Sequence, residues 1–189
     1  KDDAAIWDVN TGARLASVSL SNIPTHAIAY SPDGSQITVG ARSDHTWISN
    51  ATTGGGTHHL PHGNSENAVL SVAYAPDGRQ LATGSTDHQA RVWSPATGAL
   101  LLALPHVGSV EKVAFLSGSR RLVTGTEQNV VRVWDLDTGL ASQLPTTDDG
   151  SLTAVWGTTL VATGHADDSA RVWSIDTGEE LNHFQAHTA

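Results

Sequence analysis

Residues 90–98 read Ala-Arg-Val-Trp-Ser-Pro-Ala-Thr-Gly, and closely similar text returns at 131–139 and at 170–178. Each copy has an Arg two residues before a Trp and a Thr-Gly pair shortly after it. Looser copies surround Trp7 and Trp47, so five Trp residues recur at intervals of about 40 residues. A regular spacing of this length indicates a repeat protein in which each repeat forms one structural unit.

Turn signals divide each repeat into short segments. Pro-Asp-Gly at 32–34 and at 76–78 is typical of a hairpin turn, because Pro presets φ at one corner and Gly accepts positive φ at another. Short apolar runs precede and follow each of these turns, another run ends at the Trp, and a fourth follows the Thr-Gly pair. Runs of this length predict antiparallel strands, and no stretch of helical length has a 3.6-residue period. Each repeat therefore predicts four strands.

A period near 40 residues, four strands per copy and a Trp-Asp ending resemble the WD-repeat (WD40-type) β-propeller family. The resemblance covers essentially the whole chain. It implies an all-β fold, a β-propeller of four-stranded antiparallel blades, with about 4.5 blades present and 18 strands in one partial domain. The expected divisions are a half blade at 1–20 and four blades at 21–61, 62–104, 105–144 and 145–189.

The predicted ring is incomplete, since the family's usual ring has seven blades. We expect the chain to be part of a longer propeller, so that the rest of the ring is its first partner. Two alternatives stay open at this stage. Two copies could assemble into a larger ring, or the ring could close tightly on four blades and leave the first two strands as a flap.

The resemblance also implies a structural hydrogen-bonded tetrad in each blade. Its members are a His before the first strand, a Ser or Thr of the second strand, an Asp of the next turn, and the Trp. The repeat at 62–104 has the full set, and two later repeats depart from it with Gln128 for the Asp and Thr146 for the His. We expect the complete tetrad to be buried and mutually hydrogen-bonded, and its neighbours to be weaker. The complete tetrad is His62, Thr83, Asp87 and Trp93.

Composition narrows the classes of function. The chain has 189 residues, 19 acidic and 10 basic, for a formal net charge of −9. Phosphate binding needs clustered Lys and Arg, so nucleic acid and membrane are not expected partners, and a basic protein surface is a better match. The chain has no Cys, which excludes disulfides, thiolate metal sites and cysteine nucleophiles. We expect no cofactor. The compartment is left open, with the cytoplasm favoured.

Three groups of residues invite a catalytic or metal-binding interpretation. The tetrad combines a hydroxyl residue, a His and an Asp, as a Ser-His-Asp catalytic triad does, but the family places these side chains inside the blade, away from substrate. His58 and His62 lie roughly 13 Å apart on an extended strand, too far to share one zinc ion. Asp148 and Asp149 could join Asp168 on one face to bind Ca²⁺ or a basic patch. Structural or solvated roles are favoured for all three groups.

The favoured function is a non-catalytic scaffold that binds other proteins through one face. This loop face carries the loops before each first strand and the turns between second and third strands. The alternatives are a propeller enzyme with a site in the central channel, and a carbohydrate-binding propeller. The residues of the innermost strands are mainly small and apolar, which does not favour an enzyme site in the channel. Aromatic residues are only 5% of the chain, which does not favour carbohydrate binding. The candidate partner-binding residues are Glu66, Thr86, His88, Glu127, Asp148, Asp149, His165 and Asp168.

Overall fold

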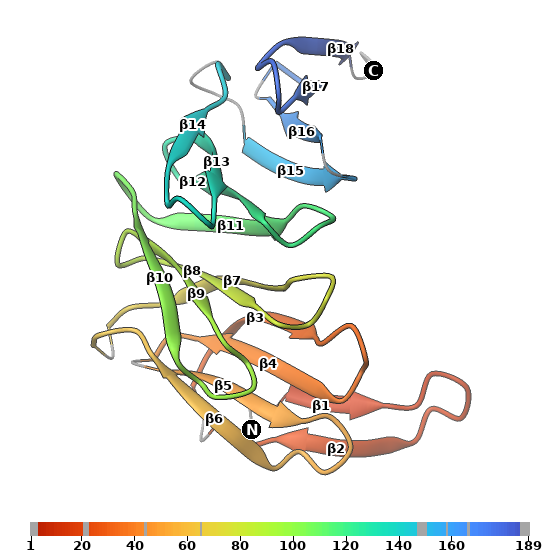
Figure 1. Cartoon of the computed structure of the whole chain (residues 1–189). Coiled ribbons are helices and arrows are strands. Elements are labelled where there is room, and N and C mark those ends of the chain that lie inside the picture. Colours follow the sequence, from red (N-terminus) through yellow and green to blue (C-terminus); the bar gives the residue numbers. More distant parts are fainter. Residues whose placement is uncertain are drawn as a thin grey trace.

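The computed structural model describes residues 4–20, 23–43, 45–64, 66–146, 151–157, 159–165 and 167–185, with 151–156 described as backbone only. These residues form β-strands joined by turns (Figure 1). The half-blade contains β1 (Ala4–Trp7) and β2 (Arg14–Val18). The first blade contains β3 (Thr25–Tyr30), β4 (Gln36–Ala41), β5 (His45–Asn50) and β6 (Gly56–Pro61). The second contains β7 (Val69–Tyr74), β8 (Leu81–Ser85), β9 (Gln89–Trp93) and β10 (Leu100–Pro105).

The last two blades repeat this plan. The third blade contains β11 (Val110–Phe115), β12 (Arg121–Thr126), β13 (Val131–Asp135) and β14 (Ala141–Gln143). The fourth contains β15 (Ser151–Trp156), β16 (Leu160–Gly164), β17 (Ser169–Ser174) and β18 (Glu180–Gln185). Each blade is an antiparallel sheet whose strands pair in chain order. The predicted all-β class and the four-stranded blades are thereby confirmed, and the described residues contain the predicted 18 strands.

The blades follow one another along an open arc, with the half-blade at one end and the fourth blade at the other (Figure 1). The first strand of each blade packs on the first strand of the next, so β3 contacts β7, β7 contacts β11 and β11 contacts β15. In Figure 1 the described residues form an arc that stays open between the half-blade and the fourth blade. The half-blade packs on the first blade through a buried apolar cluster. The division of the chain at residues 21, 62, 105 and 145 stays a prediction.

Close stacking of blades explains a repeated Gly in the second strand. All residues of β8 are buried, because neighbouring blades cover both faces of the sheet. A Cβ added to Gly84 would lie 2.8 Å from the carbonyl oxygen of Val110 in the next blade. A Cβ at Gly40 would lie equally close to the Val69 side chain. Glycine at these positions lets adjacent blades approach to backbone contact.

Apolar clusters and a few polar contacts join adjacent blades. One buried cluster joins Ile48 and Leu60 of the first blade to Leu81 and Trp93 of the second. Across the same boundary, the Thr38 Oγ1 and the Tyr74 hydroxyl lie 2.7 Å apart. Each blade is therefore stabilised mainly by its immediate neighbours, as in other repeat proteins. No helix in the described residues is long and apolar enough to span a membrane.

Candidate functional site

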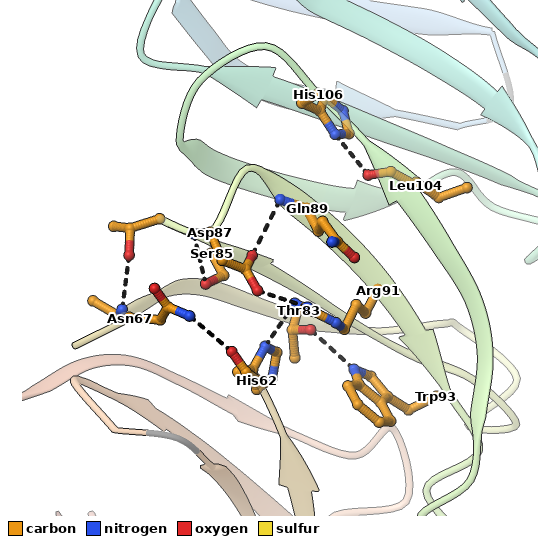
Figure 2. A network of polar contacts seen from close by, with 12 residues as sticks. His62, Asn67, Thr83, Ser85, Asp87, Gln89, Arg91, Trp93, Leu104 and His106 are labelled. Atoms are coloured by element: carbon orange, nitrogen blue, oxygen red, sulfur yellow. Dashed lines mark hydrogen bonds and ion pairs between the residues drawn. The ribbon is translucent and has the colours of Figure 1, made fainter. Parts of the chain in front are cut away.

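The second blade holds the predicted tetrad in its interior. The register of β8 and β9 sets Leu81 opposite Trp93, which brings the indole across to the side chain of Thr83. Trp93 Nε1 donates a hydrogen bond of 2.9 Å to Thr83 Oγ1 (Figure 2). His62 is fully buried, and its ring centroid lies 5.5 Å from that of Trp93. The expected burial of His62, Thr83 and Trp93 agrees with the structure.

The link between His62 and Asp87 differs from the prediction. Figure 2 shows Arg91 lying between the two side chains. Arg91 Nη1 donates to His62 Nδ1 at 3.2 Å, and Arg91 Nη2 lies 2.6 Å from Asp87 Oδ2. The arginine and the aspartate are only 11% and 12% exposed. The expected direct set of hydrogen bonds is therefore corrected to a bridge through Arg91, which makes a repeated Arg a member of the network.

His62 is held neutral by this arrangement. Burial, aided by the positive charge of Arg91, lowers the pKa of His62 to about 4. Since Arg91 can only donate, Nδ1 accepts and the proton of the neutral ring resides on Nε2. Nε2 makes no hydrogen bond within the described part of the chain. The tetrad of the second blade thus carries one unsatisfied buried donor.

The third blade forms a complete chain of hydrogen bonds in spite of Gln128. Trp134 Nε1 donates to Thr124 Oγ1 at 3.0 Å, and Thr124 Oγ1 lies 2.8 Å from His106 Nε2. His106 Nδ1 lies 2.9 Å from the carbonyl oxygen of Leu104, which takes the place of the missing carboxylate. Gln128 donates instead to the neighbouring Glu127. Burial lowers the pKa of His106 to about 4, so this imidazole is also neutral.

The fourth blade replaces the missing loop histidine from a different position. Trp173 Nε1 donates to Thr163 Oγ1 at 2.8 Å, and the same oxygen lies 2.8 Å from His165 Nε2. His165 directly follows β16 and is only 9% exposed. The prediction that His165 belongs to the exposed partner-binding face is therefore wrong. Its imidazole makes the contact with the blade threonine that His106 makes in the third blade.

Trp47 is out of register with the other repeated Trp residues. In the second blade Trp93 lies opposite Leu81, the first residue of β8. In the first blade the corresponding partner of Ile37 is Ser49, and Trp47 lies two residues earlier. The sequence-based alignment of Trp47 with Trp93 is therefore corrected, and Ser49 occupies the tetrad-Trp position.

An apolar cluster replaces the tetrad in the first blade. Val39 lies opposite Trp47, as Thr83 lies opposite Arg91 in the second blade. Val39 therefore holds the hydroxyl position, and Trp47 the arginine position. Val39 is fully buried in a cluster that includes Leu20, and Trp47 packs against this cluster. Val39 itself needs no hydrogen-bond partner, so the loss of the hydroxyl leaves no unpaired polar group at that position.

The tetrads do not have the geometry of a catalytic site. Thr83, Thr124 and Thr163 are fully buried, so no substrate can reach their hydroxyl groups. Among the described residues, no three His, Asp or Glu side chains converge on a point where a metal ion could bind. Asp167, next to the candidate Asp168, is hydrogen-bonded to Arg171 and to the backbone N–H of Ser169. These networks fix turns against strands.

The two loop types of the loop face are hydrogen-bonded to each other. In the second blade, the backbone N–H of Thr86 donates to Ala68, and the Ala68 N–H donates back to Thr86 Oγ1 at 2.8 Å. In the third blade, Glu127 and Ser109 make the same reciprocal pair, with Glu127 Oε1 accepting at 3.1 Å. Thr86 and Glu127 therefore hold the face together, and these hydrogen bonds lower the pKa of Glu127.

The remaining candidates on the loop face are solvent-exposed. Glu66 is exposed in the loop before β7. His88 and Asp168 are exposed in second-to-third-strand turns at φ values of 64° and 59°, a conformation that His, Asn and Asp tolerate better than most residues. Asp148 and Asp149 lie outside the described residues. Sequence reasoning missed Arg91, His165 as a core residue, and the Leu104 carbonyl. Only the repeated Arg-Val-Trp text signalled the first of these.

Comparisons with known proteins agree with this architecture. The family model described as "WD domain, G-beta repeat" matches residues 56–94 and 99–135. The solved structure "Crystal structure of RRP9 WD40 repeats" aligns with a TM-score of 0.79 at 23% identity, covering 90% of this chain and 53% of that one. "Structure of U3-55K" aligns with a TM-score of 0.80 at 23% identity, covering 90% and 54%. This chain thus spans about half the length of those chains. No curated protein matches significantly. At this identity the likeness shows the fold alone.

Proposed function

We propose that this chain is a non-catalytic scaffold that binds another protein through its loop face. The chain carries WD40 repeats at 56–94 and 99–135 and folds as an arc of propeller blades. A fold by itself does not fix a function. The proposal therefore depends on this face, its rigidity and its charge.

One observation carries the proposal. The loop face combines turns fixed by hydrogen bonds with acidic side chains that point into solvent. Glu66, Glu127 and Asp168 are exposed. In the second and third blades, one backbone–backbone hydrogen bond and one return bond to a Thr86 or Glu127 side-chain oxygen join the two loop types. A preorganised surface loses little conformational entropy on binding. Its negative charge favours a partner with a basic surface.

The enzyme alternative has less support. A catalytic site needs an accessible nucleophile or a general base poised beside substrate. The two histidines with strongly lowered pKa values, His62 and His106, are buried inside blades. Their hydroxyl neighbours are buried with them. These imidazole and hydroxyl groups therefore serve to stabilise the blades and are not accessible to a substrate.

A quantitative affinity capture with two matched variants tests the proposal. The face variant combines Glu66→Gln, Glu127→Gln and Asp168→Asn, which remove three charges but keep the hydrogen-bonding shapes. The control variant removes three charges at the opposite end of the blades, with Asp77→Asn and Glu179→Gln in turns and Glu180→Gln at the first residue of β18. We expect proteins with basic surfaces to be captured by the wild type and by the control variant, and to be depleted several-fold from the face variant.

Two outcomes would contradict the proposal. Equal capture by the face and control variants would place the binding surface elsewhere on the molecule. Capture that depends on the face but survives high salt unchanged would contradict the electrostatic part of the proposal, because exposed charges are screened by salt. The control variant should keep the wild-type melting temperature, since surface changes of this kind alter stability by no more than about 0.5 kcal/mol. The face variant should melt at a slightly lower temperature, because Glu127→Gln replaces the charged acceptor of the Ser109 N–H by a neutral one.

A further inference from the structure

The hairpin turn between the first and second strands is shorter in the fourth blade than in the other three. Six residues separate the paired Phe115 and Leu122 of the third blade, and the first and second blades have the same spacing. Only three residues separate the paired Trp156 and Leu160 of the fourth blade. The fourth blade therefore lacks the tip of a turn that the other blades carry.

Turn tips of adjacent blades touch where both turns have their full length. A Cβ added to Gly78 in the turn of the second blade would lie 3.7 Å from the Pro32 side chain in the turn of the first. Ser117 holds the position of Pro32 in the third blade, since each is the second residue of its turn. The Ser117 N–H donates to the Gly157 carbonyl of the short turn, yet Ser117 and Gly118 stay exposed. The short turn thus leaves the tip of the third blade's turn uncovered.

A pocket lies beside this uncovered turn, at the end of the blades opposite the loop face. Its volume is about 240 Å³, below the roughly 300–1,000 Å³ of most small-molecule sites. The fourth blade contributes Thr159 from its short turn and Asp176 from the β17–β18 turn. The third blade contributes Ser117, Gly118, Arg120 and Arg121. The pocket has room for the tip of one turn.

The charged lining of the pocket differs in sign from the chain as a whole. It has two arginines and one aspartate, whereas the chain has a formal net charge of −9. Arg120 and Arg121 are the only adjacent basic residues in the sequence. Their side chains are 77% and 42% exposed, so an incoming group can reach both guanidinium groups. The pocket therefore favours an anionic group.

The ion pairs that the two arginines already make leave donors for a further partner. Arg120 pairs with Asp137, and Arg121 Nη1 lies 2.6 Å from Asp176 Oδ1 across the blade boundary. A guanidinium group carries five N–H donors in a planar fork, so each arginine can bind a second carboxylate. Exposed ion pairs contribute little to stability, and Asp137 therefore competes only weakly with an incoming carboxylate.

We infer that this pocket binds the tip of a tight turn of a partner protein that presents an Asp or Glu side chain. The turn fills the space that the short turn of the fourth blade leaves open, and its carboxylate accepts hydrogen bonds from Arg120 and Arg121. The site does not depend on the proposed function of the loop face. The two ends of the blades differ in preference, because the loop face favours a basic surface and the pocket favours an acidic turn.

A cyclic peptide that contains Ser-Pro-Asp-Gly-Ser, the sequence of this chain's own turn at 31–35, is the probe. Cyclisation holds the turn and lowers the entropy lost on binding. Titration of the whole chain is followed by amide chemical shifts in heteronuclear NMR. We expect saturable shifts that are confined to residues 116–121, 159–160 and 174–178. The same peptide with Asn in place of Asp should bind roughly 2- to 5-fold more weakly, the contribution of one exposed ion pair. Absence of saturable shifts, or equal binding of the two peptides, would overturn the inference.

Three variants locate the site, and all three change exposed residues, so they should fold as the wild type does. Arg120→Gln should weaken binding of the Asp peptide by roughly 2- to 5-fold. Arg79→Gln makes the same change at the equivalent position of the second blade, where the next turn has its full length, and should leave binding unchanged. Asp137→Asn frees Arg120 from its ion pair and should strengthen binding. Equal effects of Arg120→Gln and Arg79→Gln, or binding that Asp137→Asn does not strengthen, would contradict the assignment.

Discussion

His165 Nε2 lies 2.8 Å from Thr163 Oγ1. An imidazole just after the second strand of the fourth blade thus makes the threonine contact for which this blade has no loop histidine. Replacing His165 by Leu should lower the free energy of unfolding by about 1–3 kcal/mol, because a buried hydrogen-bond partner is lost. Urea denaturation measures this change. The exposed His26 is the control, and His26→Ala should stay within about 0.5 kcal/mol of the wild type. Equal effects of the two substitutions would mean that His165 has no structural role.

The indoles of the second and third blades should be of similar importance. Trp93 and Trp134 are 2% and 6% exposed, and each donates to a buried Thr. Replacing either by Ala should destabilise the chain by about 3–5 kcal/mol, as for other large-to-small core changes. The sequence alone indicated a weaker third blade because of Gln128, but the Leu104 carbonyl completes its network. A cost for Trp134→Ala of less than half that for Trp93→Ala would restore the sequence-based expectation.

Arg91 and Asp87 should be energetically coupled. Their contact of 2.6 Å is nearly shielded from solvent, and Arg91 also donates to His62. Arg91→Met and Asp87→Asn should each lower the stability by about 1–3 kcal/mol. In a double-mutant cycle the combined change should be smaller than the sum of the single changes by at least about 0.5 kcal/mol. Strict additivity would show that the bridge contributes nothing.

The free energy of unfolding should decrease as the pH is lowered through the range in which histidine titrates. The pKa values of His62 and His106 are about 4 in the folded chain, against an ordinary value of 6.5, chiefly because both rings are buried. Between these values the unfolded chain binds protons that the folded chain does not. Stability is therefore fully present above about pH 6.5 and decreases as the pH falls towards 4.

Urea denaturation at several pH values measures this slope. The double variant His62→Gln/His106→Gln should be less stable at neutral pH but should lose less stability between about pH 6.5 and 4.5. The exposed His26 is again the control, and His26→Ala should keep the wild-type slope. An unchanged slope in the double variant would show that these two histidines do not carry the pH dependence.

The strands were predictable because their signals are local. Pro-Asp-Gly and Thr-Gly turns fix where each strand begins and ends, and the repeat supplies several copies of the same pattern. Trp93, Trp134 and Trp173 were correctly assigned because each is the last residue of an Arg-Val-Trp triplet. The family comparison and the structure agree with this part of the prediction.

The hydrogen-bonded partners were less predictable because they are set by contacts in space. Trp47 was aligned with Trp93 because both residues are Trp. The position of the Thr53-Gly54 turn nevertheless fixes the register of β5 and places Ser49 at the position equivalent to Trp93. The role of His165 depends on the direction in which its side chain leaves the end of β16. The role of Leu104 depends on a backbone carbonyl, which no residue type marks.

The loop face is tested most directly by association kinetics. A partner recovered with the wild type is mixed with the wild type, the face variant and the control variant at ionic strengths from about 0.05 to 0.3 M, a range over which screening of exposed charges changes strongly. The predicted result is slower association of the face variant, with a flatter dependence on salt, and unchanged kinetics of the control variant. Identical association rates and salt dependence for all three proteins would contradict the assignment of partner binding to Glu66, Glu127 and Asp168.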